Sequence, residues 1–159
     1  MIKIFTTGGT IDKTYFDQKD SYHVGEPQVA GILERANVVV DFEVCSLMKK
    51  DSLEIDNADR KILRDAILSE QNSHIIVTHG TDTMIETAEF LQNIPHKTIV
   101  LTGSMYPAQY RDSDAIFNLG CTLIAAQILE PGVYIAMNGR IFNPLDSVKN
   151  IALNRFENK

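Results

Sequence analysis

Two threonine-bearing turns, far apart in the chain, hold the residue types that could do chemistry. Residues 6–11 read TTGGTI and residues 77–83 read VTHGTDT. A threonine hydroxyl becomes an effective nucleophile only beside a base or a desolvated partner. Each turn follows a short apolar run, so we expect both at the carboxyl ends of strands, where open parallel sheets bind ligands. The pair predicts one site built on hydroxyl chemistry.

The first turn places Thr10 directly after Gly8 and Gly9. Glycine allows a ligand to approach the backbone closely, which suits a nucleophile. The alternative is a tight strand-to-loop turn in which the hydroxyl only caps the backbone. Neither the Gly-Lys-Ser/Thr of a P-loop nor the Gly-x-Gly-x-x-Gly of a dinucleotide site is present, so a nucleotide site is not indicated.

The second turn contains Thr81 and Asp82, which we expect to open a helix. Free N–H groups at a helix start can stabilise an oxyanion. Asp82 could instead hold a substrate ammonium group, and plain N-capping by either residue is the alternative. Lys149 becomes a candidate base only if the fold returns it beside Thr81, where burial would lower its pKa. Otherwise it is a surface lysine.

The histidines and cysteines give weaker indications of a functional site than the threonine turns do. His79 lies in the second turn, where a lone histidine is more often structural than catalytic. The other three histidines show no ligand spacing with acidic residues, so no metal site is predicted. Cys45 and Cys121 are expected to be buried free thiols.

The elements that must position these residues alternate between strand-like and helix-like runs. This pattern predicts an α/β fold with a doubly wound, mostly parallel sheet, a Rossmann/flavodoxin-like three-layer sandwich in a single domain over 1–159. The expected strands cover 2–6, 38–47, 74–78, 98–102 and 133–137, and the expected helices cover 27–36, a segment capped by Asp56, 82–92 and 112–130.

The sequence also predicts which helix faces are buried and how several connecting and terminal segments fold. The helix after Asp56 should bury Ile62, Leu63, Ala66 and Ile67, and the helix over 112–130 should bury Ile116, Gly120, Leu123, Ile124 and Ile128. Asn138-Gly139 predicts a hairpin into a small antiparallel addition over 140–143. Residues 145–159 read as a short helix fraying into a polar tail. Residues 12–25 have no clean period, and a loop of that length is usually functional.

Composition excludes several classes of protein. The 159 residues carry a net charge of −6, with no basic run longer than Lys49-Lys50, which disfavours nucleic acids and anionic membranes as partners. No apolar run approaches the roughly 18–20 residues of a membrane span. The first strand begins at the amino terminus, so no signal peptide is expected and the cytoplasm is predicted.

Together the motifs resemble the bacterial-type L-asparaginase family. Residues 7–11 look like its first signature, and 79–84 with 86–88 look like its second. Gly103-Ser104-Met105 with Pro107 is similar to the third strand-end turn, and Asp114 with 117–119 resembles the following helix. The resemblance covers essentially the whole chain, but only the amino-terminal domain of a typical member.

The resemblance implies a role for each matching residue. Thr10 would be the nucleophile on the side-chain amide carbon, activated by Tyr22, with Tyr15 a weaker candidate. Thr81, Asp82 and Lys149 would form a second catalytic group for proton transfer or water attack. Asp82 would bind the substrate's α-amino group and Ser52 its α-carboxylate. The remaining substrate-binding positions would be Gly9, Leu53, Gly80, Ser104 and Met105.

The implied reaction forms an acyl-threonine intermediate with release of ammonia, then hydrolyses it to aspartate, without a metal or organic cofactor. Asparagine would be the substrate, with glutamine as the alternative, and the protein would be a homodimer or higher homo-oligomer. Rival hypotheses are a non-catalytic binder of aspartate or asparagine and an amidase subunit of a larger complex.

Three departures from the family pattern bear on these hypotheses. The carboxyl-terminal domain, which supplies an acidic residue to the neighbour's site, is absent, and Glu26 and Glu54 are the nearest substitutes by sequence. Leu53 stands where a polar contact is common. The chain stops ten residues after Lys149.

Overall fold

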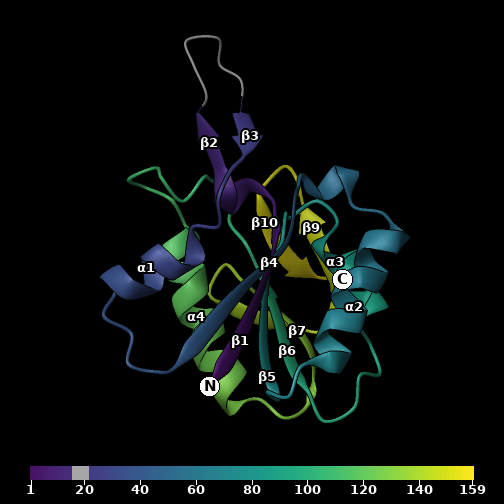
Figure 1. Ribbon diagram of the computed structural model, residues 1–159. Coiled ribbons are helices and arrows are strands. Elements are labelled where there is room, and N and C mark those ends of the chain that lie inside the picture. The colour runs from purple at the N-terminus through teal and green to yellow at the C-terminus, as the bar shows by residue number, and fades with distance from the viewer. Residues whose placement is uncertain (16–21) are drawn as a thin grey trace.

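A six-stranded sheet forms the centre of the protein in the computed structural model, which describes residues 1–15 and 22–159 (Figure 1). The strand order is β4-β1-β5-β6-β7-β8, and every neighbouring pair is parallel except β7 with β8. The predicted α/β doubly wound fold is therefore confirmed. The strands are β1 (Ile2–Gly8), β4 (Phe42–Lys50), β5 (His74–Thr78), β6 (Thr98–Thr102), β7 (Gly132–Met137) and β8 (Arg140–Phe142).

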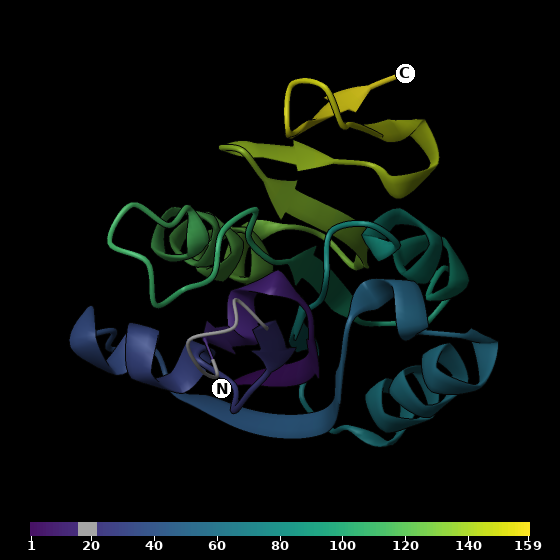
Figure 2. The same ribbon diagram turned by 90° about the horizontal axis from the view of Figure 1, so that it is seen from above.

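Helices cover both faces of the sheet (Figure 2). One core joins Ile76 and Val100 of the sheet to α1 and α4, and the other joins Ile75 and Val77 to α2 and α3. Neighbouring residues of one strand thus point into opposite cores, which explains the continuous apolar runs of a parallel sheet. The helices are α1 (Val29–Arg35), α2 (Asn57–Ser69), α3 (Met84–Phe90) and α4 (Ala115–Ile128).

The buried face of α4 differs from the prediction. The helix buries Ala115, Leu119, Leu123 and Ala126, whereas Ile116, Gly120, Ile124 and Ile128 are exposed. Only Leu123 was correctly placed. Because α4 is apolar nearly all the way round, its periodicity does not select a face, and packing on the sheet decides it.

The helix after Asp56 follows its prediction more closely. Asp56 accepts a bond from Asp59 N–H in a capping box, and Leu63 and Ile67 are buried. Ala66 is partly buried, and Ile62 is exposed, contrary to expectation. The strand predicted over 38–47 also shifts, because β4 begins at Phe42 and not at Val38. Cys45 and Cys121 are free, as predicted, but partly exposed.

The carboxyl-terminal segment is a hairpin and not the predicted helix. A 3-10 turn over Pro144–Asp146 leads into β9 (Ser147–Asn150), which pairs antiparallel with β10 (Arg155–Asn158). Phe156 is buried, with its ring 6.2 Å from that of Phe142. The preceding β7–β8 hairpin is confirmed, with positive φ at both Asn138 and Gly139. Tertiary packing of Phe156 therefore attaches the last hairpin to the sheet.

The described parts of the predicted loop over 12–25, residues 12–15 and 22–25, are more regular than expected. A 3-10 turn over Thr10–Asp12 leads into β2 (Lys13–Tyr15), which pairs antiparallel with β3 (Tyr22–Val24). Figure 1 shows this β2–β3 hairpin rising from the carboxyl edge of the sheet. Residues 16–21, the centre of the predicted loop, lie outside the described residues. No helix in the described part of the chain is long and apolar enough to cross a membrane.

Candidate active site

The two threonine turns meet at the carboxyl ends of β1 and β5, where Thr6 and Thr78 are register partners. Gly9 has a φ of 85°, and a Cβ there would lie 2.3 Å from Gly80 N. A Cβ on Gly80 would lie 2.6 Å from the Ser52 side chain. Side chains at either glycine would therefore separate the three segments that carry Thr10, Thr81 and Ser52.

Lys149 reaches this junction from β9. Its Nζ donates to Thr81 Oγ1 at 2.8 Å and to Asp82 Oδ1 at 2.6 Å. The Lys149 side chain is 17% exposed and that of Asp82 is 47% exposed, so the lysine is sheltered while the carboxylate faces solvent. The fold thus places Lys149 beside Thr81. This is the condition under which the sequence made Lys149 a candidate base.

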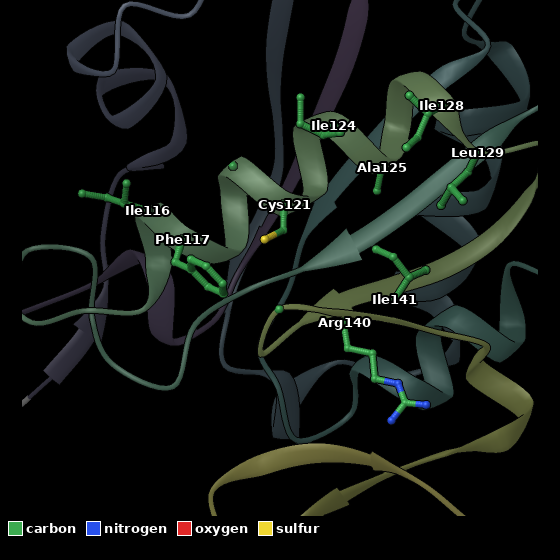
Figure 3. A pocket seen from close by; sticks show the side chains of 11 residues that line it. Ile116, Phe117, Cys121, Ile124, Ala125, Ile128, Leu129, Arg140 and Ile141 are labelled. Carbon is green, nitrogen blue, oxygen red and sulfur yellow. The ribbon is translucent and has the colours of Figure 1, made fainter.

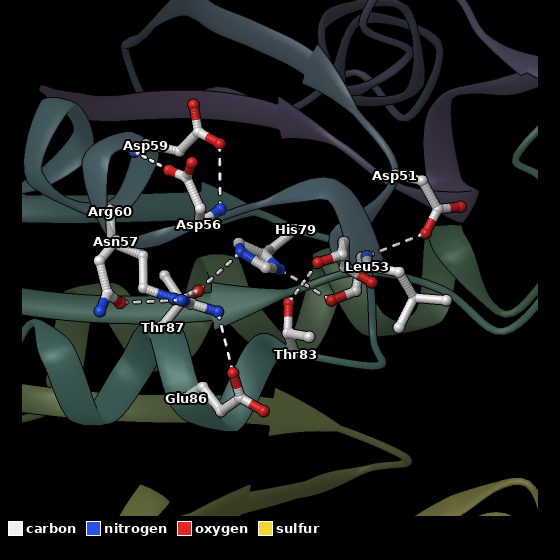
Figure 4. Close-up of polar contacts among 12 residues, drawn as sticks. Asp51, Leu53, Asp56, Asn57, Asp59, Arg60, His79, Thr83, Glu86 and Thr87 are labelled. Carbon is white, nitrogen blue, oxygen red and sulfur yellow. Dashed lines mark hydrogen bonds and ion pairs between the residues drawn. The ribbon is translucent and has the colours of Figure 1, made fainter.

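The start of α3 corrects the expected role of Thr81 and Asp82. The helix begins at Met84 with Thr83 at the N-cap position, so neither Thr81 nor Asp82 opens or caps it. The Thr83 hydroxyl makes no cap bond and donates to Ser52 O at 2.7 Å. This bond ties the second turn to the Ser52 segment (Figure 4).

A 3-10 turn over Ser52–Glu54 holds the predicted carboxylate-binding residue. Asp51 caps it and accepts from Leu53 N–H, while Glu54 accepts from Asp51 N–H. Ser52 is buried and Leu53 is 75% exposed. Burial of Asp51 opposes its ionisation, but hydrogen bonds from Lys13 and Leu53 N–H outweigh that effect and lower the pKa of the Asp51 carboxyl.

Thr10 is partly buried at the start of its 3-10 turn. Across residues 1–15 and 22–159, no side chain hydrogen-bonds its hydroxyl. Tyr22, on β3, bonds through its own hydroxyl to the Tyr110 hydroxyl. Tyr15 is the register partner of Tyr22 on β2. The structure therefore does not bring Thr10 and Tyr22 into hydrogen-bond contact.

His79 is fully buried beneath the second turn (Figure 4). Its Nδ1 lies 2.8 Å from Gly80 O, which can only accept, so Nδ1 carries the proton. Nε2 then accepts from the Thr87 hydroxyl at 2.9 Å, and that hydroxyl accepts from Arg60 Nε. Burial lowers the pKa of His79 to about 4. The imidazole is therefore neutral, and both of its nitrogens are hydrogen-bonded, so it supports the backbone of the turn. This matches the expectation that His79 is structural and not catalytic.

The third strand-end turn lies against the second. A Cβ on Gly103 would lie 2.3 Å from His79 O. Ser104 is buried and donates to Tyr106 O, while Met105 N–H donates to the Asp114 carboxylate at 3.0 Å. Ser104 and Met105 are thus fixed by contacts within their own loop.

The two acidic residues considered as substitutes have other partners. Glu26 pairs with Lys49 at 2.5 Å, and Glu54 belongs to the capping box of Asp51. The buried carboxyl beside Thr10 is instead Asp12, which accepts from Gln28 N–H at 2.8 Å and which sequence reasoning missed. An acidic residue directly after the apolar Ile11 was the available signal. The described residues contain no group of three His, Cys, Asp or Glu side chains that could hold a metal ion.

Comparison with known proteins identifies the family. A family model described as Asparaginase, N-terminal matches residues 1–157. The chain belongs to the asparaginase family. An L-asparaginase of Thermococcus kodakarensis is 31% identical, covering 97% of this chain, and its solved structure has a TM-score of 0.85 at 28% identity over 99% of this chain.

Two further asparaginase relatives show the same pattern. A glutaminase-asparaginase of Acinetobacter glutaminasificans is 30% identical over 94% of this chain. A probable cytoplasmic L-asparaginase from Campylobacter jejuni has a TM-score of 0.80 at 27% identity over 99% of this chain. The chain spans 49%, 50% and 52% of the lengths of these three relatives, so it corresponds to about half of each.

Proposed function

We propose that this protein is an L-asparaginase-type amidohydrolase that converts asparagine to aspartate and ammonia. The observation that carries the proposal is the bridge from Lys149 Nζ to Thr81 Oγ1 and Asp82 Oδ1, beside the turn that bears Thr10. Family membership and the names of the relatives support the same activity.

In the proposed reaction, the Thr10 oxygen bonds to the side-chain amide carbon of asparagine. The C–N bond breaks, and the nitrogen leaves as ammonia after gaining the equivalent of the proton that the hydroxyl loses. Water then bonds to the acyl carbon, the bond to Thr10 breaks, and aspartate leaves with the hydroxyl restored. No metal or cofactor is required by this balance.

The proton transfers are assigned to groups near the two turns. Tyr22 is proposed to accept the Thr10 proton, which requires its hydroxyl to exchange Tyr110 for Thr10 when substrate binds. Catalytic hydrogen bonds often form only in the substrate complex, so the present geometry does not argue against this role. Thr81 and Lys149 are proposed to relay a proton to the leaving nitrogen and to assist the attacking water.

Substrate orientation follows from charge. The half-exposed Asp82 carboxylate suits the α-ammonium, and the Ser52 segment, fixed by Thr83, is proposed to bind the α-carboxylate. Gly9 and Gly80 keep the backbones of the two turns close to each other and to Ser52, and are proposed to let the ligand approach these backbones. Leu53, Ser104 and Met105 complete the proposed binding site. One methylene separates asparagine from glutamine and is worth only about 1–3 kcal/mol of discrimination, so both are to be assayed.

Ammonia release from asparagine and from glutamine tests the function, with Thr10→Ala and Thr81→Ala as variants. We expect each to reduce kcat by about 10²–10⁴ while the fold persists. Ser69→Ala, at the exposed end of α2, is the control. Aspartate binding without turnover would contradict the enzyme and support the non-catalytic binder. Turnover that appears only with added partner proteins would support an amidase subunit of a larger complex.

We further propose that residues 1–159 form one asparaginase N-terminal-type domain, that the protein is cytoplasmic and that it self-associates. Support for self-association comes from an apolar groove of about 580 Å³ between α4 and β8 (Figure 3). Ile124 and Ile128 in this groove are 56% and 72% exposed, and contiguous exposed apolar side chains mark interaction sites. Sedimentation measures the association, and cell fractionation tests the compartment.

A further inference from the structure

Asp12 makes three contacts that the proposed reaction does not use. Its amide N–H donates to Gly9 O at 3.1 Å, and its carbonyl accepts from Gly25 N–H at 2.8 Å. Its carboxylate Oδ1 accepts from Gln28 N–H at 2.8 Å. One residue thus links the turn that bears Thr10 to the segment that leaves the β2–β3 hairpin.

Asp12 lies at the base of the β2–β3 hairpin, so these contacts hold the hairpin in place. β2 begins at the next residue, Lys13, whose register partner Val24 ends β3. Asp12 therefore holds both ends of the hairpin that carries Tyr22. A further bond, from Ala108 N–H to Ile11 O at 3.1 Å, ties the turn to the loop that precedes α4.

Among residues 1–15 and 22–159, no charged side chain pairs with the carboxyl of Asp12. The residue is 2% exposed, and burying an unpaired charge is costly. The adjacent charged groups have partners of their own, because Lys13 pairs with Asp51 and Glu26 pairs with Lys49. The other charged residues on the packed segments are exposed: Glu34 and Arg35 at the far end of α1, and Arg111 and Asp112 in the loop bonded to Ile11.

We propose that Asp12 is a positioning residue whose buried carboxyl clasps the base of the β2–β3 hairpin to the turn that bears Thr10. A charged acceptor makes a shorter and stronger hydrogen bond to N–H than a neutral one. Ionisation therefore strengthens this one bond, but it also buries a charge, and the cost of that burial is larger. The clasp is accordingly tighter when the carboxyl is protonated and looser when it is ionised. The effect on turnover, through the placement of Tyr22, rests on the proposed function, whereas the clasp itself does not.

The direction of the pH dependence follows. Burial raises the pKa of Asp12 to about 7, and the bond from Gln28 N–H only partly offsets this. A solvated carboxyl in an opened hairpin would titrate near the ordinary value of 3.8, so ionisation favours opening and the clasp loosens as pH rises through about 7. After correction for the intrinsic, base-catalysed rise in exchange, the hairpin amides should be less protected above this pH, and kcat should fall across it.

NMR of the full chain from about pH 5 to about pH 9 tests the clasp directly. We expect the Gln28 amide resonance to titrate with a midpoint near 7 in the wild type and to lose that transition in Asp12→Asn, which retains a neutral oxygen acceptor. Asp12→Ala should speed amide exchange in β2 and β3 about tenfold or more. Asp41→Asn, an exposed carboxylate preceding β4, is the matched control.

The pH dependence of kcat and KM distinguishes a positioning role of Asp12 from a purely structural one. We expect the wild-type kcat to fall as pH rises through about 7 and the profile of Asp12→Asn to lack that step. Asp12→Ala should lower kcat by about tenfold to a hundredfold with KM nearly unchanged. A Gln28 amide without a transition near 7 would overturn the clasp. A wild-type pH profile in Asp12→Asn would overturn its link to turnover. A titrating Gln28 in a protein without ammonia release would uphold the clasp and contradict the proposed function.

Discussion

Lys149 and Thr81, separated by 68 positions in the chain, are joined by a 2.8 Å hydrogen bond from Nζ to Oγ1. The lysine lies on β9, beyond the last strand of the main sheet, and its register partner on β10 is Phe156. The site on the carboxyl edge of the sheet therefore depends on a terminal hairpin that is outside the sheet. Both the charge of Lys149 and the packing of its hairpin lead to predictions.

Lys149→Met should abolish most activity without unfolding the protein. Methionine keeps the length of the side chain but removes the donor to Thr81 and Asp82, and loss of a proton-transfer partner typically costs about 10²–10⁴ in rate. Steady-state ammonia release and circular dichroism measure the two effects. Lys61→Met, on the exposed face of α2, should retain wild-type activity.

Phe156→Ala should detach the β9–β10 hairpin and thereby lower activity at a distance. The buried ring packs on Phe142, and such a truncation costs about 3–5 kcal/mol where the structure is cooperative. Thermal unfolding gives the stability, and hydrogen exchange of residues 147–158 gives the local effect. Val148→Ala changes an exposed side chain of the same hairpin and is the control. An active Phe156→Ala variant with a protected hairpin would contradict the dependence of Lys149 on this packing.

Gly80→Ala should separate the two turns from the Ser52 segment. The new Cβ would lie 2.6 Å from Ser52 Cβ and Oγ, closer than packed atoms come, so we expect a large loss of kcat/KM. Gly120→Ala is the contrasting case, because nothing lies within 4 Å of its Cβ and a helical alanine is favoured by about 0.5–1 kcal/mol. Assay and melting temperature together distinguish the two substitutions; equal activity in both would contradict the close packing.

Asp12→Asn should stabilise the protein at alkaline pH. The folded pKa of about 7 exceeds the ordinary value of 3.8, so the folded state binds more protons than the unfolded state between these values. Stability associated with Asp12 is present below about pH 3.8 and is lost as pH rises to about 7. Above this window the cost of the buried charge is on the order of 4 kcal/mol. Urea unfolding at acidic and alkaline pH should show the variant gaining stability relative to wild type only as pH rises.

Ile124→Lys should weaken self-association. The side chain is exposed in the groove between α4 and β8, and a charge there would have to be desolvated when a second copy covers it. Sedimentation velocity across a concentration series measures the change. Ile62→Lys, exposed on α2, is the control. A wild-type chain that stays monomeric throughout would contradict the proposed oligomer.

Local sequence determined several strands of the main sheet and the turns that follow them. Apolar runs bounded by glycine or proline predicted β5 and β6 to the residue, and Asn138-Gly139 predicted the β7–β8 hairpin, because these signals act between neighbours. The turns with Thr10 and Thr81 were likewise recognisable, since strands that run parallel end at the same edge.

Tertiary structure decided what local signals leave open. α4 is apolar on several faces, so only its packing on the sheet showed that Ile124 and Ile128 are exposed. The last fifteen residues form strands because Phe156 is buried against Phe142, a contact that no local period reveals. The environment of Asp12 and the approach of Lys149 to Thr81 depend on segments remote in sequence. Residue type alone therefore did not determine the burial of Asp12 or the contact of Lys149 with Thr81. Packing between segments far apart in the chain determined both.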